Sequence, residues 1–198
     1  MKVIEQEIHS LKNSISEMWA LVHQQLYNAG EAMLTGDKEL AYKVISRERR
    51  VNAFELKIDS DCEDIIALYA PVAIDLRFVL AMYKINTNLE RLGDFAESIA
   101  RFAGNLPEGE PIDPQLVKET RVEEMLSELL SMISLTKEAF EKESSEIASR
   151  IFLKDNLIDE INHNSTAIIA KYIEEHKGSA LAGLYMAGVI RKMERFGD

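Results

Sequence analysis

Two nearly identical words in this sequence place acidic residues four apart on either side of a glycine. They read ERLGD, which begins at Glu90 and ends at Asp94, and ERFGD, which begins at Glu194 and ends at Asp198. On a helix, residues four apart lie on one face, so each word presents a pair of carboxylates. Carboxylates are the ligands of hard or intermediate cations, so the pairs predict cation sites. A glycine inside a helix costs about 1 kcal/mol relative to alanine, and its presence beside each pair needs a reason.

Further acidic side chains stand where an apolar helix seam is expected. Glu48 and Glu55 occupy positions of a seam, spaced by four and three residues, that is otherwise apolar. A carboxylate that faces a core is costly unless it is paired or binds a metal. Asn52 and Asp59 share the neighbouring stripe. If the chain turns back near residue 72, the first acidic pair lies within a helical turn of this stripe, and we expect one site there.

The second half of the chain offers a comparable set. If the chain also turns back near residue 178, two antiparallel helices meet there. Residues at equal distances from the turn then lie side by side, which places Asp155, Asp159 and His163 near Glu194 and Asp198. Gly93 and Gly197 have no Cβ atom, so we expect them to leave room beside the carboxylates for ions or for a neighbouring backbone. The candidate metal ligands are Glu48, Asn52, Glu55, Glu90, Asp94, Asp155, Asp159, His163, Glu194 and Asp198.

A solvated acidic surface on a metal-free helical scaffold is one alternative interpretation. With 34 acidic residues among 198, chance gives roughly six acidic pairs at this spacing. A repeated word opposite further acids favours cations instead, with magnesium, calcium, manganese, iron and zinc as candidates. A carboxylate-bridged oxidase is another alternative, but it needs an ExxH spacing on two helices, and Glu160 with His163 supplies one. His9, His23 and His176 lack clustered partners and are expected at the surface or at helix ends.

Composition and missing motifs narrow the function further. No Gly-rich phosphate loop, CxxC pair or nucleophile elbow occurs, so we predict no catalytic or cofactor-binding residue and no enzyme. The net charge of -11 argues against broad nucleic-acid binding. The single cysteine excludes an internal disulfide. Neither a signal core nor a long apolar run is found, which favours a cytoplasmic protein.

Six long helices are expected to position these residues. Three of the four prolines fall in NLPEGEPIDPQ, which starts at Asn105 and separates three helices from three more. Gly36 is expected to end the first helix and Asp37 to cap the second. The expected helices span about 4–34, 38–69, 74–103, 115–140, 144–176 and 179–198.

A second repeated word points to an internal duplication. IIALY, which begins at Ile65, returns as IIAKY, which begins at Ile168, at nearly the same offset as the ERxGD words. We therefore predict an all-α fold of tandem, pseudo-symmetric three-helix bundles. The bundles would comprise residues 1–104 and 115–198, joined by a linker at 105–114.

These residues resemble the PhoU family. The run from Val51 to Ala100, with its Asp75-Leu-Arg77 step and the first ERxGD word, is similar to the first-repeat signature of that family. KDNLIDE and ERFGD are similar to the second repeat, so the resemblance covers essentially the whole chain. It implies tandem three-helix bundles whose E/DxxxD motifs bind metal clusters on the bundle surface. The last helix of the family continues past this word, so we expect either that the sequence stops before the end of this helix or that the helix is shortened.

The resemblance also assigns residues. The two ERxGD pairs match the third-helix motif of each repeat, and Asp155 with Asp159 matches the motif on the middle helix of the second repeat. Glu48 and Asn52 stand at the corresponding place in the first repeat, where the last residue is Asn.

The function that the resemblance implies is negative regulation of phosphate uptake and signalling. Members of the family are thought to connect a phosphate ABC transporter, through its ATPase, with a membrane sensor histidine kinase. Membrane association would then occur only through partners, no nucleic acid would be bound, and a homo-oligomer is compatible with the sequence. Regulation of a sodium–phosphate cotransporter is the alternative, because similar domains are attached to such transporters.

Overall fold

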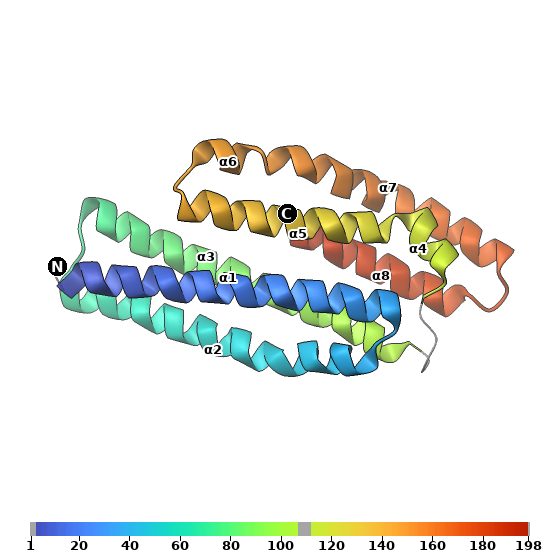
Figure 1. The fold of residues 1–198 in the computed structure, drawn as a ribbon, viewed down its shortest axis with the longest axis horizontal. Helices are drawn as coiled ribbons and strands as arrows, with labels where there is room; N and C mark the ends of the chain where they lie inside the picture. Colours follow the sequence, from blue (N-terminus) through green and yellow to red (C-terminus); the bar gives the residue numbers. More distant parts are fainter. Residues whose placement is uncertain (1–2, 107–111, 198) are drawn as a thin grey trace.

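The computed structural model describes residues 3–106 and 112–197, and every regular element in these ranges is a helix. The first three helices are α1 (Val3–Thr35), α2 (Lys38–Tyr69) and α3 (Ala73–Asn105), which pack against one another as a three-helix bundle (Figure 1). The predicted boundary between α1 and α2 is confirmed. Gly36 takes a positive φ of 71°, and the side chain of Asp37 accepts a hydrogen bond from the backbone N–H of Leu40.

The second half contains five helical segments where three long helices were expected. They are α4 (Pro114–Thr120), α5 (Val122–Glu141), α6 (Ser145–Ser149), α7 (Phe152–Glu175) and α8 (Ala180–Gly197). Two of the expected helices are therefore interrupted, the first between α4 and α5 and the second between α6 and α7. The all-α fold class is confirmed. The domain limits and the linker stay a prediction, and linker residues 107–111 lie outside the described ranges.

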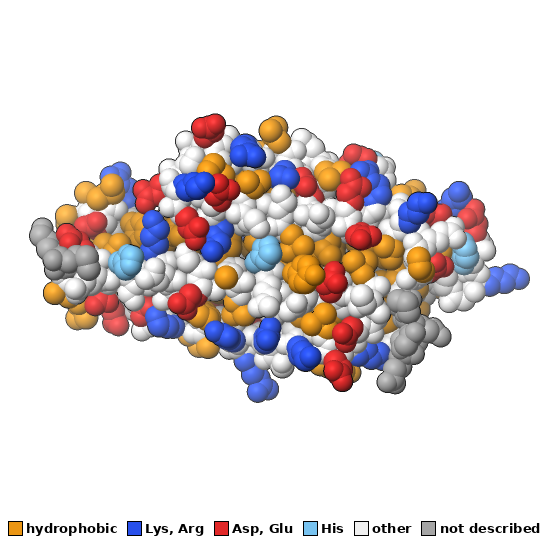
Figure 2. Space-filling model, in the orientation of Figure 1, with side chains coloured by type: hydrophobic (Ala, Val, Ile, Leu, Met, Phe, Trp, Pro, Cys, Tyr) orange, Lys and Arg blue, Asp and Glu red, His pale blue; other side chains and the backbone are white. Residues whose placement is uncertain are grey.

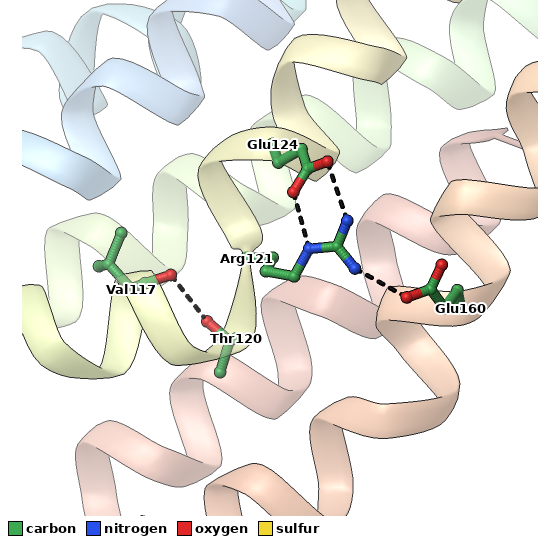
Figure 3. A network of polar contacts seen from close by, with 5 residues as sticks. All are labelled: Val117, Thr120, Arg121, Glu124 and Glu160. Carbon is green, nitrogen blue, oxygen red and sulfur yellow. Dashed lines mark hydrogen bonds and ion pairs between the residues drawn. The ribbon is translucent and has the colours of Figure 1, made fainter.

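Arg121 makes the break between α4 and α5 (Figure 3). Its φ of 56° lies in the left-handed region, which a residue other than glycine rarely adopts. The guanidinium group donates two hydrogen bonds to the carboxylate of Glu124 and one, of 2.8 Å, to Glu160 on α7. The break thus links the start of α5 to α7.

Apolar contacts join the two halves along α1 and α5 and along α3 and α8. Trp19 stacks on Phe140 with ring centroids 5.6 Å apart, and Phe102 lies 5.9 Å from Tyr185. A Cβ atom added to Gly30 would lie 2.2 Å from Leu126 Cδ2, so a larger residue there requires the Leu126 side chain on α5 to shift. The buried apolar residues of both halves form one connected core. None of the described helices is long and apolar enough to cross a membrane.

Two glycines fix the register between the halves. A Cβ atom on Gly93 of α3 would lie 2.9 Å from Val51 Cγ1 on α2, and one on Gly197 of α8 would lie 3.1 Å from Ile158 Cδ1 on α7. Val51 and Ile158 are therefore equivalent, which makes Glu48 the equivalent of Asp155, since each stands three residues earlier.

The repeated IIALY and IIAKY words do not follow this register. Ile65 is buried, whereas Ile168, the first residue of the second word, is half-buried. The buried residues of the second word are Ile169 and Tyr172, which the glycine register aligns with the buried Cys62 and Ile65. IIAKY on α7 therefore lies about one helical turn away from the position on α2 that IIALY occupies. The connection between α7 and α8 differs from that between α2 and α3 to the same extent.

Candidate functional site

An acidic face runs along α2 and α3 of the first bundle, where the sequence predicted a site. We call it the α2–α3 acidic face, and it comprises Glu48, Asn52, Glu55, Asp59, Glu90, Asp94 and Glu97. Glu48 is the most unusual member, because it is 5% exposed and both of its carboxylate oxygens are buried without a hydrogen-bond partner in the described chain. Burial, together with the negative charges of Asp94, Glu97 and Glu90, raises the pKa of Glu48 to about 7.

The neighbouring glutamates are coupled to the same charges. Burial raises the pKa of Glu55, and Asp59 and Asp94 raise it further. Burial also raises the pKa of Glu90, to which Asp94 and Glu55 add while Arg91 opposes them. Asp94 acts on three glutamates from two helices, so the predicted convergence of the α2 and α3 carboxylates is present in the structure.

Gly93 of α3 lies opposite Val51 and Glu48 of α2 within this face. A Cβ atom at this position would lie 2.9 Å from Val51 Cγ1 and 3.4 Å from each carboxylate oxygen of Glu48. The glycine therefore serves two purposes. It lets α3 pack against Val51, and it leaves the space next to the partnerless carboxylate free of side-chain atoms.

Asn86 holds another part of the face in position. Its side chain is fully buried, and its Nδ2 atom donates hydrogen bonds to the backbone oxygen of Glu55, at 2.9 Å, and to Asp59 Oδ1, at 2.7 Å. Its Oδ1 atom has no partner among the described residues. Asn86 is not among the candidate metal ligands predicted from the sequence. In the second half, Ile190 stands four residues before Glu194, just as Asn86 stands four before Glu90.

The face is open and is not a closed ligand cluster. No group of three or more His, Cys, Asp or Glu side chains in residues 3–106 and 112–197 is close enough to hold a metal ion as the side chains stand. Asn52 is exposed, and Glu97 forms a 2.6 Å ion pair with Arg101. The donor types and the orphaned Glu48 oxygens nevertheless fit a hard cation, because an anionic group buried without a partner needs a positive charge nearby.

The second candidate set lies on α7 and α8. Asp155, Asp159 and His163 follow one another at intervals of four along α7, and the last two are exposed. Glu194 is half-buried on α8, and Asp198 lies outside the described residues. The ExxH spacing does not act as a unit, because Glu160 pairs with Arg121 at 2.8 Å.

The surroundings of Gly197 differ from those of Gly93. The nearest side-chain atoms to a Cβ at Gly197 would be Ile158 Cδ1, at 3.1 Å, and Leu129 Cδ2, at 3.3 Å. Both are apolar, so this glycine permits close helix packing, and its three nearest side-chain atoms include no carboxylate oxygen, unlike those of Gly93. The expectation that both glycines make room beside carboxylates holds for the first half among the described residues.

The sequence analysis did not predict the groove that lies between the two halves. The groove has a volume of about 860 Å³ and is lined mainly by apolar side chains of α1, α3, α5, α6, α7 and α8, together with Asn88, Thr136 and Asp155. Arg91 and Arg195, the arginines of the two repeated words, both reach this groove. The recurrence of these arginines at matching positions of ERLGD and ERFGD was the sequence feature that could have indicated a shared surface.

Comparisons with known proteins agree with the fold. A family model described as PhoU domain matches residues 15–103 and 122–198. A protein of Aquifex aeolicus named as a phosphate-specific transport system accessory protein PhoU homolog is 32% identical over 191 residues, which cover 96% of this chain and 84% of that protein. The Escherichia coli phosphate-specific transport system accessory protein PhoU is 32% identical over 195 residues, which cover 97% and 78%.

Solved structures agree as well. The phosphate transport system regulatory protein PhoU from Streptococcus pneumoniae superposes with a TM-score of 0.86 at 28% identity, covering 98% of this chain and 90% of that one. PhoU from Pseudomonas aeruginosa also gives a TM-score of 0.86, at 26% identity, covering 98% and 91%. The two separate matches to the domain model fall on the two halves that the repeated words had indicated. The chain belongs to the PhoU family.

Proposed function

We propose that this protein is an accessory regulator of a phosphate-specific transport system and that it acts by binding, without catalysis. The curated relatives, about 30% identical over nearly the whole chain, are named as accessory proteins of a phosphate-specific transport system. The partners of the proposal are the ATPase of a phosphate ABC transporter and a membrane sensor histidine kinase, between which the protein serves as a helical adaptor in the cytoplasm. Names that specify a phosphate-specific transport system favour this role over service to a sodium–phosphate cotransporter.

Cation binding at the acidic face is part of this proposal, and the partnerless buried carboxylate of Glu48 is the observation that carries it. In the first bundle, the cation would be held by Glu48, Glu55, Glu90 and Asp94, with Asn52 at the edge. A bound divalent or trivalent ion supplies positive charge that removes the mutual repulsion of these groups. Asp155, Asp159, His163, Glu194 and Asp198 would form the second site. Iron, manganese, zinc and magnesium all suit carboxylate oxygens.

Deletion of the gene in its own host tests the regulatory role. A reporter of the phosphate-starvation response should become active in phosphate-rich medium when the gene is absent, and the unmodified gene should restore repression. A reporter that stays repressed in the deletion strain would contradict negative regulation. The Glu90→Gln, Asp94→Asn variant tests the metal site in the same strain. If this variant restores repression as fully as the parent does, the protein is a regulator but its regulation does not need the metal site.

Metal binding has its own assay. The purified protein is exposed to iron, manganese, zinc or magnesium, desalted, and analysed for bound metal by mass spectrometry. We expect the parent to retain metal and the double variant to lose the share held by the α2–α3 acidic face. Equal retention by the two proteins would place the ions elsewhere.

A further inference from the structure

The connection between α2 and α3 forms an exposed apolar tip at one end of the first bundle. Three large apolar side chains near it are almost fully solvated: Leu68 is 72% exposed, Val72 is 73% exposed and Ile74 is 73% exposed. We call these three residues the α2–α3 tip. Hydrophobic side chains are visible at this end of the molecule, at the left in Figure 2. Single exposed apolar residues are ordinary in proteins, whereas several gathered on one short connection mark an interaction surface.

The backbone holds this tip in one conformation before any partner arrives. Ala70 and Ala73 both have positive φ values, of 45° and 48°, in the left-handed region that normally favours glycine. Pro71 between them is buried and has a fixed φ. Backbone hydrogen bonds of 3.2 Å close both sides, from Ala70 N–H to Ile66 O and from Asp75 N–H to Val72 O. A preformed tip loses little conformational entropy on binding, and strained backbone of this kind occurs most often at functional surfaces.

The charges around the tip are mainly negative. Between residues 63 and 77 the sequence carries Glu63, Asp64 and Asp75 against a single cation, Arg77. Glu63 and Asp64 are exposed on the last turns of α2, and neither forms an ion pair with another described residue. A complementary surface would offer an apolar cleft with lysine or arginine side chains at its rim. An anionic lipid bilayer would instead repel the acidic rim of the tip.

The corresponding tip of the second bundle has a different character. Leu181 and Leu184 at the start of α8 are 54% and 67% exposed, and the connection before them carries Lys177 and turns through Gly178, whose φ is 91°. Glu174 and Glu175 are exposed on the last turn of α7, but Lys171 pairs with Glu175, so the tandem halves share exposed apolar residues at their tips and differ in charge balance and in the Ala-Pro connection. This second tip provides a matched control within the same chain.

We propose that the α2–α3 tip docks into an apolar, basic-rimmed cleft of a protein component of the phosphate transport system. This inference rests on the proposed function, because the partner belongs to that system. Leu68, Val72 and Ile74 would fill the cleft, and Glu63 and Asp64 would face its basic rim. The candidate metal ligands Glu48, Glu90 and Asp94 are not part of this surface, so docking and metal binding can be changed separately.

Purified ATPase subunit of the phosphate transporter from the same organism is the probe. Its affinity is measured for the unmodified chain, for the triple variant Leu68→Ser, Val72→Ser, Ile74→Ser, and for the control Leu181→Ser, Leu184→Ser. Circular dichroism and thermal unfolding verify that each variant folds. We expect the triple variant to weaken binding at least about tenfold and the control to change it less than about twofold. Glu63→Lys with Asp64→Lys should also weaken binding, and more so at low salt than at high salt.

Each other outcome overturns the inference. If the parent binds the ATPase and the triple variant binds equally well, the tip is not the docking surface, although the proposed function survives. If the parent does not bind the ATPase, both this partner and the tip assignment fall. Vesicles of phosphatidylglycerol and phosphatidylethanolamine that bind the parent but not the triple variant would show a lipid surface instead. Self-association that the triple variant abolishes would identify a second copy of the chain as the occupant.

Discussion

Replacing Glu48 with glutamine should stabilise the metal-free protein, and the gain should grow with pH. The carboxyl is 5% exposed, and its pKa is raised from 4.5 to about 7 by burial and by Asp94, Glu97 and Glu90. Because the folded pKa lies above the unfolded one, the native state binds the extra proton between these values. The unfolding free energy therefore falls as pH rises from about 4.5 to about 7 and then levels off. A difference of about 2.5 pKa units corresponds to about 3 kcal/mol.

Glu48→Gln removes this titration while keeping nearly the same side-chain volume. The variant should equal the parent near pH 4.5 and exceed it by up to about 3 kcal/mol at pH 8. Urea unfolding at pH 5, 6, 7 and 8 in the presence of a chelator measures the difference. Glu63→Gln, an exposed site on the same helix, is the control and should show a small, flat difference. A Glu48→Gln difference that is equally flat between pH 5 and 8 would refute the claim that Glu48 is buried without a charge partner.

Three further predictions concern the helix contacts and the cation. Gly93→Ala should gain about 1 kcal/mol in helix propensity but lose about 1–3 kcal/mol through the 2.9 Å contact with Val51, so urea unfolding should show a neutral to destabilised protein. Gly30→Ala should destabilise by a similar 1–3 kcal/mol, since its Cβ would overlap a leucine of α5, and unchanged stability would contradict the close α1–α5 packing. Manganese at a hundredfold excess over its dissociation constant should stabilise the parent by about 2.7 kcal/mol. In the Glu90→Gln, Asp94→Asn variant, the melting temperature should rise less steeply with manganese concentration. Equal slopes for the two proteins would count against the site.

The helices of the first bundle could be predicted to within two residues because local signals agree with the tertiary structure. The expected span of 38–69 is the observed α2, and α1 and α3 extend only slightly past their predicted ends. Gly36, Asp37 and Pro71 mark the ends of these helices by their backbone preferences. Where helix-ending residues and apolar periodicity agree, the sequence alone is enough to predict the limits of a helix.

The interruptions of the second bundle had no such local signal. Arg121 has no intrinsic preference for a left-handed conformation, and neither glycine nor proline marks the break. Its guanidinium donates hydrogen bonds to Glu124, three residues further along in α5, and to Glu160 on α7. The break between α6 and α7 likewise falls at Arg150 and Ile151, residues that usually continue a helix. The bond of Arg121 to Glu160 joins residues far apart in the sequence, so periodicity along one helix could not reveal it.

The sequence predicted where the candidate site lies, but not which residue plays which part in it. Spacing on α2 and α3 placed Glu48 with Glu90 and Asp94, and their mutual effects on pKa agree with that. The same reasoning treated the two glycines as equivalent, yet one adjoins a carboxylate and the other adjoins isoleucine and leucine. The repeated ERxGD sequence indicates that α3 and α8 are equivalent helices. The side chains next to each glycine, however, come from the neighbouring helix, and these differ between the two halves.

The two halves therefore share a scaffold and differ in electrostatics. The first has a buried glutamate without a partner and a buried asparagine that orients Asp59, while the second has Ile190 at the place of that asparagine. A cation in the first half would neutralise a charge that the fold has already desolvated, so its binding is coupled to the stability of α2 and α3. These are the same two helices that meet at the rigid apolar tip. The candidate cation site lies along this helical hairpin and the apolar tip at its end, so a substitution at one leaves the residues of the other unchanged, and Glu48 is the group whose charge an ion would balance.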